Sequence, residues 1–214
     1  MKTKAISAAL AFALAFAANL SAAAGQGADD PREFLKTATG EIITLLYDTP
    51  NPEGKSLVEV LRPIVPKYLD PAGITRRTIG PTWRTYSEAE RARVTELFTD
   101  VVLRTYGDSF EPGERPEVSY GEAQVISNPQ ARPVRSEVAT VISYAGKKYN
   151  VSLRVEQGAA GWRIYDIIAE GVSLISNYRG QLEPITKRGG AKAVIAALEK
   201  NLADLNAKRV DVKK

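Results

Sequence analysis

One acidic side chain in this sequence has the surroundings that proton-transfer chemistry requires. Asp166 interrupts the apolar stretch GWRIYDIIAE, next to Tyr165 and four residues before Glu170. An Asp and a Tyr inside a small cone-shaped α+β domain can move protons to and from a substrate. In the alternative, structural interpretation, the carboxylate caps a backbone N–H group or pairs with an arginine near a pocket rim. We favour the structural interpretation because one embedded acid is weak evidence for catalysis.

The sequence contains no histidine and no cysteine, which removes many of the side chains used in nucleophilic and metal chemistry. Ser-His and Cys-His pairs cannot form, and no thiolate is available to bind a metal ion. The sequence also lacks Ser-x-x-Lys, Gly-x-Ser-x-Gly, Gly-x-x-x-x-Gly-Lys and acidic calcium-loop motifs. These observations argue against hydrolysis and phosphoryl transfer, and we expect no enzyme activity and no metal.

The N-terminus has the three parts of a secretory signal. Basic residues precede an apolar run over residues 5–18, and small residues fit a cleavage site after Ala24. The apolar run is shorter than the roughly 20 residues that a membrane-spanning helix needs. We therefore predict a signal peptide over residues 1–24 and one exported domain over residues 25–214.

The net charge excludes one class of partner. The formal charge of +4 falls to +2 when Lys2 and Lys4 leave with the signal. Because this value lacks the basic excess typical of nucleic-acid-binding proteins, we expect no nucleic-acid partner. Short basic groups such as Arg76/Arg77 are solvated patches that can also meet anionic lipid headgroups.

Helical periodicity dominates the first half of the predicted domain. Residues 29–47 predict an amphipathic helix that opens with a capping aspartate and a proline. Residues 56–70 predict a second helix, which two prolines kink or divide. A capping box formed by Ser87 and Glu90 opens the clearest helix, which ends at Gly107.

The second half changes to the period of two that is typical of strands. In YNVSLRVE, Tyr149, Val151 and Leu153 alternate with polar residues. Four such segments joined by short turns predict a four-stranded antiparallel meander. Two helices follow, one over about 176–188 and one after the glycine pair 189–190. The sequence thus predicts an α+β domain whose N- and C-terminal helices pack on one face of a four-stranded sheet.

The stretch GWRIYDIIAEGVSLISNYRGQL, residues 161–182, joins a strand to a helix without the polar turn that normally separates them. The alternation places Trp162, Ile164 and Ile168 on one strand face. Gly171 lets the chain bend, so that the apolar surface continues from the strand into the helix. We expect this surface to form one wall of an apolar pocket.

This stretch, together with the KRGG turn and the helix AVIAALEK, closely resembles the signature of the MlaC family of periplasmic phospholipid-binding proteins, also called the toluene-tolerance family. Upstream, IGPTWRTYSEAERARVTELFTDVVLRTYG resembles the family's Trp-Arg pair and the capped helix that follows it. The resemblance extends from about Pro31 to Leu205. It implies an α+β fold that holds the acyl chains inside and leaves the headgroup near solvent.

The resemblance further implies a monomeric periplasmic carrier whose cargo is a phospholipid and which needs no cofactor. Its implied partners are an inner-membrane ABC transporter complex with an MlaD-like subunit and an outer-membrane lipoprotein complex of the MlaA type. From the resemblance and the shared faces of the elements, we expect the lipid to contact Trp83, Leu97, Val101, Val102, Tyr149, Val151, Leu153, Trp162, Ile164, Ile168, Val172, Ile175 and Tyr178.

Overall fold

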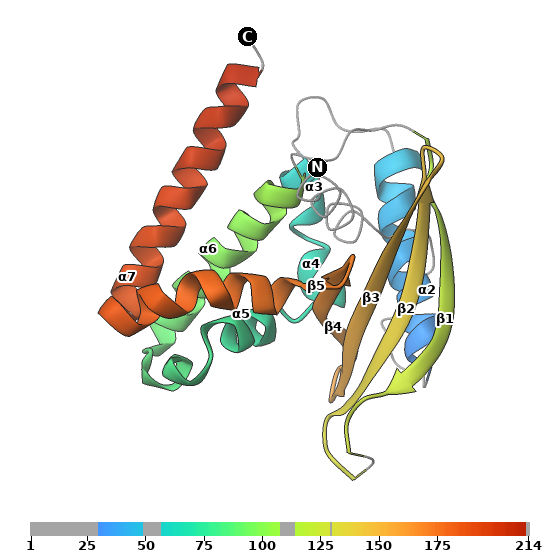
Figure 1. The fold of residues 1–214 in the computed structure, drawn as a ribbon, viewed down its shortest axis with the longest axis horizontal. Helices are drawn as coiled ribbons and strands as arrows, with labels where there is room; N and C mark the ends of the chain where they lie inside the picture. Colours follow the sequence, from blue (N-terminus) through green and yellow to red (C-terminus); the bar gives the residue numbers. More distant parts are fainter. Residues whose placement is uncertain (1–29, 49–56, 108–113, 129, 213–214) are drawn as a thin grey trace.

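The computed structural model describes residues 30–48, 57–107, 114–128 and 130–212 (Figure 1). The predicted signal peptide lies outside these residues. The helical elements are α2 (Pro31–Ile43), the π-helical turn η1 (Thr44–Asp48), α3 (Leu57–Leu61), α4 (Val65–Tyr68), α5 (Pro71–Ile79), the 3₁₀ turn η2 (Pro81–Thr85), α6 (Glu88–Gly107) and α7 (Leu174–Val212). The strands are β1 (Glu117–Val125), β2 (Val134–Tyr144), β3 (Lys147–Gly158), β4 (Gly161–Ala169) and β5 (Val172–Ser173).

The predicted helix starts are confirmed by their caps. The Asp30 carboxylate accepts a hydrogen bond from the Arg32 N–H group at 2.8 Å, with Pro31 in the first helical position of α2. In the capping box of α6, the Ser87 N–H group donates to Glu90 Oε2 at 2.8 Å. Each cap satisfies backbone donors that the first turn of a helix leaves without an intrahelical partner.

The two prolines divide the second predicted helix, giving α3 and α4. Pro63 and Pro66 lack the N–H group that an uninterrupted helix would need there. The next helix, α5, was not predicted, although Asp70 and Pro71 repeat the pattern that opens α2. The Asp70 carboxylate accepts from the Gly73 N–H group at 2.9 Å and so caps α5.

The sheet is antiparallel in the order β1-β2-β3-β4-β5, so the prediction of four strands was wrong by one. The additional strand, β5, pairs Val172 with Ala169 and Ser173 with Ile168. A tight turn with positive φ at Glu170 and Gly171 folds β5 back onto β4. A two-residue strand is too short to show a period of two, which is why the sequence pattern did not reveal it.

A β-bulge in β4 also corrects the predicted strand faces. Val155 pairs with Ile164, whereas the preceding residue, Arg154, pairs with Asp166, so Tyr165 is an extra residue in β4. Because a one-residue insertion reverses the side-chain alternation, Ile168 lies on the opposite face from Ile164. The prediction that these two side chains share a face was therefore wrong.

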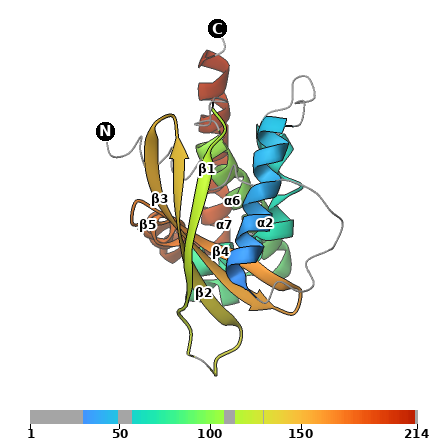
Figure 2. The ribbon, with the colours of Figure 1, turned by 90° about the vertical axis from the view of Figure 1, so that its right-hand side faces the viewer.

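Two groups of helices pack against different strands of the sheet. Helix α2 lies against β1 and β2, where the hydroxyl groups of Thr39 and Tyr120 form a hydrogen bond (Figure 2). Helices α4, α5 and the start of α7 contact β4, and α5, α6 and α7 pack against one another (Figure 1). The buried core fills the space between these helices and the sheet.

The glycine pair divides α7 into two helical parts, as predicted. Gly189 and Gly190 have non-helical backbone angles, and Gly190 has a φ of 58°. A residue with a side chain would be strained in that conformation, so glycine is favoured there. The second part turns back along α6, where Val194 and Leu198 are buried.

Candidate functional site

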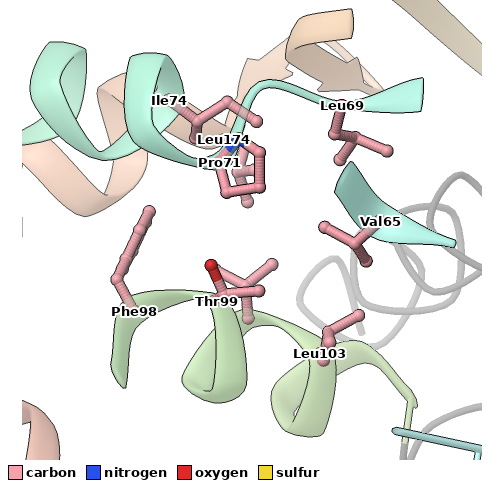
Figure 3. Close-up of a pocket in the computed structure, with 9 residues that line it drawn as sticks. Val65, Leu69, Pro71, Ile74, Phe98, Thr99, Leu103 and Leu174 are labelled. Carbon is pink, nitrogen blue, oxygen red and sulfur yellow. The ribbon is translucent and has the colours of Figure 1, made fainter. Parts of the chain in front are cut away.

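An apolar cavity lies between α4, α5, α6 and the start of α7 (Figure 3). Its volume of about 30 Å³ leaves space for little more than a water molecule. Phe98, Thr99 and Leu103 project from α6 toward the short helices on the other side. The lining comprises Val65, Leu69, Pro71, Ile74, Phe98, Thr99, Val102, Leu103 and Leu174.

The cavity lining has almost no polar chemistry. The only hydroxyl side chain of the lining belongs to Thr99, and it donates to the Thr95 carbonyl at 2.7 Å within its own helix. No acidic or basic side chain belongs to the lining. The surface can therefore bind apolar groups by excluding water, but its side chains cannot act as a general acid or base.

The corner between α4 and α5 places two of the lining residues. The Asp70 N–H group donates to the Ile164 carbonyl at 3.1 Å, and Leu69 forms an isolated parallel bridge with the same residue. This bridge attaches the corner to the free edge of β4. Leu69 and Pro71 consequently lie opposite Phe98 and Leu103 of α6 (Figure 3).

One residue of the predicted lipid-binding set, Val102, lines this cavity. The sheet residues of the set pack into the core instead: Val151 is 2% exposed and Leu153 is 4% exposed. They share the core-facing side of the sheet with Ile164, according to the pairing of β3 with β4. The buried members outside the lining are Trp83, Leu97, Val101, Val151, Leu153, Trp162, Ile164, Ile175 and Tyr178. The half-buried members are Tyr149, Ile168 and Val172.

The aromatic residues of the set occupy separate places. Tyr178 packs edge-on against Phe98, with ring centroids 5.0 Å apart, so it supports the cavity wall from behind. Burial raises the pKa of the Tyr178 hydroxyl. Trp83 lies in η2, where it contacts the Tyr86 ring and the Arg91 guanidinium.

The sequence did not predict most of the residues that line the cavity. Phe98 belongs to the apolar face of α6 that the sequence shows, and Leu174 belongs to the apolar junction after Gly171. Val65 and Leu69 belong to the segment broken by prolines, where no helical period reveals which side chains point inward. The signal that was available is the combination of prolines and large apolar residues in RPIVPKYLDPAGI.

Asp166 has the structural role that the sequence favoured. Its Oδ1 atom accepts hydrogen bonds from the N–H groups of Ile167 at 3.0 Å and Ile175 at 3.2 Å. Its Oδ2 atom accepts from the Ser173 hydroxyl at 2.8 Å and from Arg154 at 3.5 Å. The carboxylate thus both caps the first turn of α7 and pairs with an arginine, the two alternatives offered by the structural interpretation.

We expect Asp166→Asn to lower stability without changing lipid binding. The amide oxygen can still accept from backbone N–H groups, but the variant loses the charge-assisted bonds to Arg154 and the helix start. The free energy of unfolding should fall by about 1–3 kcal/mol, measured by urea denaturation. Ser173→Ala, which removes a neutral donor to the same carboxylate together with the acceptor for the Ser176 N–H group, is the comparison and should cost about 0.5–2 kcal/mol. Chemical turnover of a bound lipid that disappears in Asp166→Asn would contradict the structural role.

A second cluster of charged and aromatic side chains surrounds Tyr165, the extra residue of the β4 bulge. The Arg77 guanidinium lies 4.5 Å from the Tyr165 ring centroid, and Arg135 lies 5.8 Å from it. Both arginines also pair with Glu156, at 2.5 Å and 3.4 Å. Burial raises the pKa of Tyr165 while the neighbouring arginines oppose that increase. This cluster connects α5 to the sheet and contributes no residue to the cavity.

Over the described ranges, no group of three or more acidic, histidine or cysteine side chains is arranged to hold a metal ion. Within the same part of the chain, every helix is too short or too polar to cross a bilayer.

Comparisons with known proteins agree with this fold. The chain is similar to a solved structure of the phospholipid-binding protein from Ralstonia solanacearum in complex with a phospholipid, with 23% identity and a TM-score of 0.71. The alignment covers 83% of this chain and 99% of that one. No curated protein matches the chain. The family model described as MlaC protein matches residues 36–200, which include every residue that lines the cavity, and the chain therefore belongs to the MlaC family.

Proposed function

We propose that this protein binds a phospholipid through its acyl chains and carries it through water. The observation that carries the proposal is the apolar cavity between α4, α5, α6 and the start of α7, whose one side-chain hydroxyl is already hydrogen-bonded within its own helix. The similar Ralstonia solanacearum protein, which holds a phospholipid, supports the same conclusion. Membership of the MlaC family supports it independently of that structure.

The proposal requires the lining to separate when lipid enters. A cavity of about 30 Å³ cannot hold an acyl chain, because ligand pockets have volumes of roughly 300–1,000 Å³. Helices α3 and α4 are five and four residues long, and few helical hydrogen bonds hold them in place. We infer that the α4–α5 corner moves away from α6 to admit the tails, which then contact the buried set around Val101, Val151 and Leu153.

The energetic reason for a carrier is the cost of exposing lipid tails to water. A phospholipid with about 30 methylene groups loses roughly 0.8 kcal/mol for each group exposed, or on the order of 20 kcal/mol. An apolar interior removes most of this cost. The polar headgroup needs no such interior and would stay near solvent.

The route that the proposal implies runs across a bacterial periplasm. Residues 1–24 would direct export and be removed, leaving residues 25–214 as one monomeric carrier domain. It would exchange phospholipid between an outer-membrane lipoprotein complex of the MlaA type and an inner-membrane ABC transporter with an MlaD-like subunit. This exchange would maintain the lipid asymmetry of the outer membrane. Family membership and the secretory pattern of the N-terminus support this route.

The alternative function, an enzyme centred on Asp166, finds less support. The Asp166 carboxylate already accepts the four hydrogen bonds described above. It pairs across the sheet with Arg154 and lies on the opposite face from Ile164 and Val155. We therefore assign the protein a carrier function without catalysis.

Native mass spectrometry of the protein purified from a bacterial periplasm tests this proposal. We expect about one bound phospholipid per chain, because exposing its tails to water would be costly. Solvent extraction followed by lipid mass spectrometry identifies the molecule and detects any chemically altered product. Protein that is entirely free of lipid under gentle conditions would contradict the carrier function.

A further inference from the structure

The hairpin that joins β1 to β2 carries the most exposed large apolar side chains of the described residues. Val125 is 61% exposed and Ile126 is 45% exposed. The two residues are adjacent, at the end of β1, and the hairpin projects beyond the rest of the sheet (Figures 1 and 2). Two neighbouring apolar side chains at a projecting tip can enter an apolar phase without any rearrangement of the core.

Hydrogen bonds join the described residues on the two sides of the hairpin tip, 126–128 and 130–135. The Ile126 N–H group donates to the Arg135 carbonyl at 2.9 Å, and the Arg135 N–H group donates to the Ser127 hydroxyl at 3.1 Å. Farther along, the Ala131 N–H group donates to the Asn128 carbonyl at 2.8 Å. Because these bonds already hold the backbone around Ile126, Ser127 and Arg135, contact of this part with a surface would cost little conformational entropy.

The charged side chains of the hairpin tip are arginines, and the nearest acid on β2, Glu137, pairs with Arg154 at 2.7 Å. Residues 123–136 contain Arg132 and Arg135 and no acidic residue. The acid across the sheet, Glu156, is 9% exposed and pairs with Arg135. The nearest acid on β1, Glu122, pairs with Arg32 of α2 at 2.8 Å. An anionic surface would therefore meet mainly positive charge at this end of the sheet.

We propose that the β1–β2 hairpin tip, consisting of Val125, Ile126 and Arg132, is a membrane-contact site for bilayers that contain anionic phospholipids. The two apolar side chains enter the headgroup region, and the arginines interact with lipid phosphates. The biological purpose of this contact rests on the proposed lipid-carrier function, because a carrier benefits from brief residence at a membrane. The contact itself does not depend on whether the protein holds a lipid.

Vesicle flotation of the purified exported chain tests the site. The probe is vesicles of phosphatidylcholine alone or with about one third phosphatidylglycerol, at low and high salt. We expect the unmodified protein to float with the anionic vesicles, more strongly at low salt. The double variant Val125→Ser/Ile126→Ser should lower the association constant about tenfold or more. Arg132→Gln should lower it about fivefold.

The matched control is Lys147→Gln in the β2–β3 hairpin, at the opposite end of the sheet. It removes the same charge from an exposed position and should leave flotation unchanged. Ile126→Trp provides a gain-of-signal variant, because the two native tryptophans, Trp83 and Trp162, are buried. Its fluorescence should shift to the blue with anionic vesicles and be quenched by brominated lipids. Circular dichroism should show the same thermal unfolding for all four variants.

Two outcomes would overturn the proposal. One is an unmodified protein that does not float with anionic vesicles. The other is flotation that the Val125→Ser/Ile126→Ser variant leaves unchanged. If the variant left flotation unchanged but lost its function in cells, the tip would be a protein-binding surface instead. Native mass spectrometry of the same samples reports lipid occupancy separately, so failure of the carrier function is distinguishable from failure of the membrane contact.

Discussion

Thr99→Trp should remove most of the bound phospholipid while the protein stays folded. Thr99 is half-buried and lines the cavity opposite the α4–α5 corner (Figure 3). An indole at this position would occupy the space between α4 and α6 through which we propose that acyl chains enter. Lipid occupancy, measured by native mass spectrometry, should fall about tenfold or more, whereas the free energy of unfolding should change by about 1–2 kcal/mol.

Thr95→Trp is the matched control for this experiment. Thr95 lies one turn earlier on α6, is also half-buried and does not belong to the cavity lining. The control makes the same chemical change on the same helix and should retain lipid. Equal occupancy in both variants and the unmodified protein would show that lipid enters elsewhere. Equal loss in both would show that α6 as a whole, and not this cavity, is sensitive to bulk.

Leu153→Glu should destabilise the fold far more than Ile168→Glu. Leu153 is 4% exposed and faces the core between β2 and β4, so its carboxylate would be buried without a partner. Ile168 is half-buried and faces the opposite side because of the bulge at Tyr165. The free energy of unfolding should fall by about 3–5 kcal/mol for Leu153→Glu and about 1–2 kcal/mol for Ile168→Glu, measured by urea denaturation.

The same pair of variants tests the position of the bulge. Without the bulge, Ile168 would share the face of Ile164, and both glutamates would be equally destabilising. A volume-conserving change, Leu153→Met, should cost less than about 1.5 kcal/mol and shows that charge, not side-chain shape, causes the effect. If Leu153→Glu remained stable and lost lipid, the acyl chains would lie directly against β3, and protein side chains would not fill the space next to Leu153.

Local interactions made much of the fold predictable from sequence. The caps at Asp30 and Ser87 and the break at Gly189–Gly190 depend on residues within a few positions of one another. The strands β1 to β4 were predictable because one side of the sheet is buried and the other is not, which imposes a period of two. The short β5 and the capped helix α5 were missed, the first because it is too short for a period and the second because its Asp-Pro start was not recognised.

The bulge at Tyr165 depends on partners that are distant in the sequence. Tyr165 packs beneath Arg77 of α5 and Arg135 of β2, while Asp166 reaches the N–H group of Ile175 at the start of α7. These contacts favour one extra residue in β4, and the resulting shift moves Ile168 to the other face. In GWRIYDIIAE the trace of this shift is Asp166, which takes the position in the alternation that Trp162 and Ile164 mark as inward-facing, and one polar residue there does not distinguish a bulge from a functional acid.

By itself, the sequence determined the family and the α+β class, since these follow from motifs and from the periodicity of neighbouring residues, and it favoured a structural role for Asp166. Only the tertiary structure decided where the apolar cavity lies. Its walls come from α4, α5, α6 and α7, and its volume is the small space that remains where side chains from these elements fail to interlock. Such a remainder depends on how distant elements pack against one another, and no periodicity within a single element encodes it.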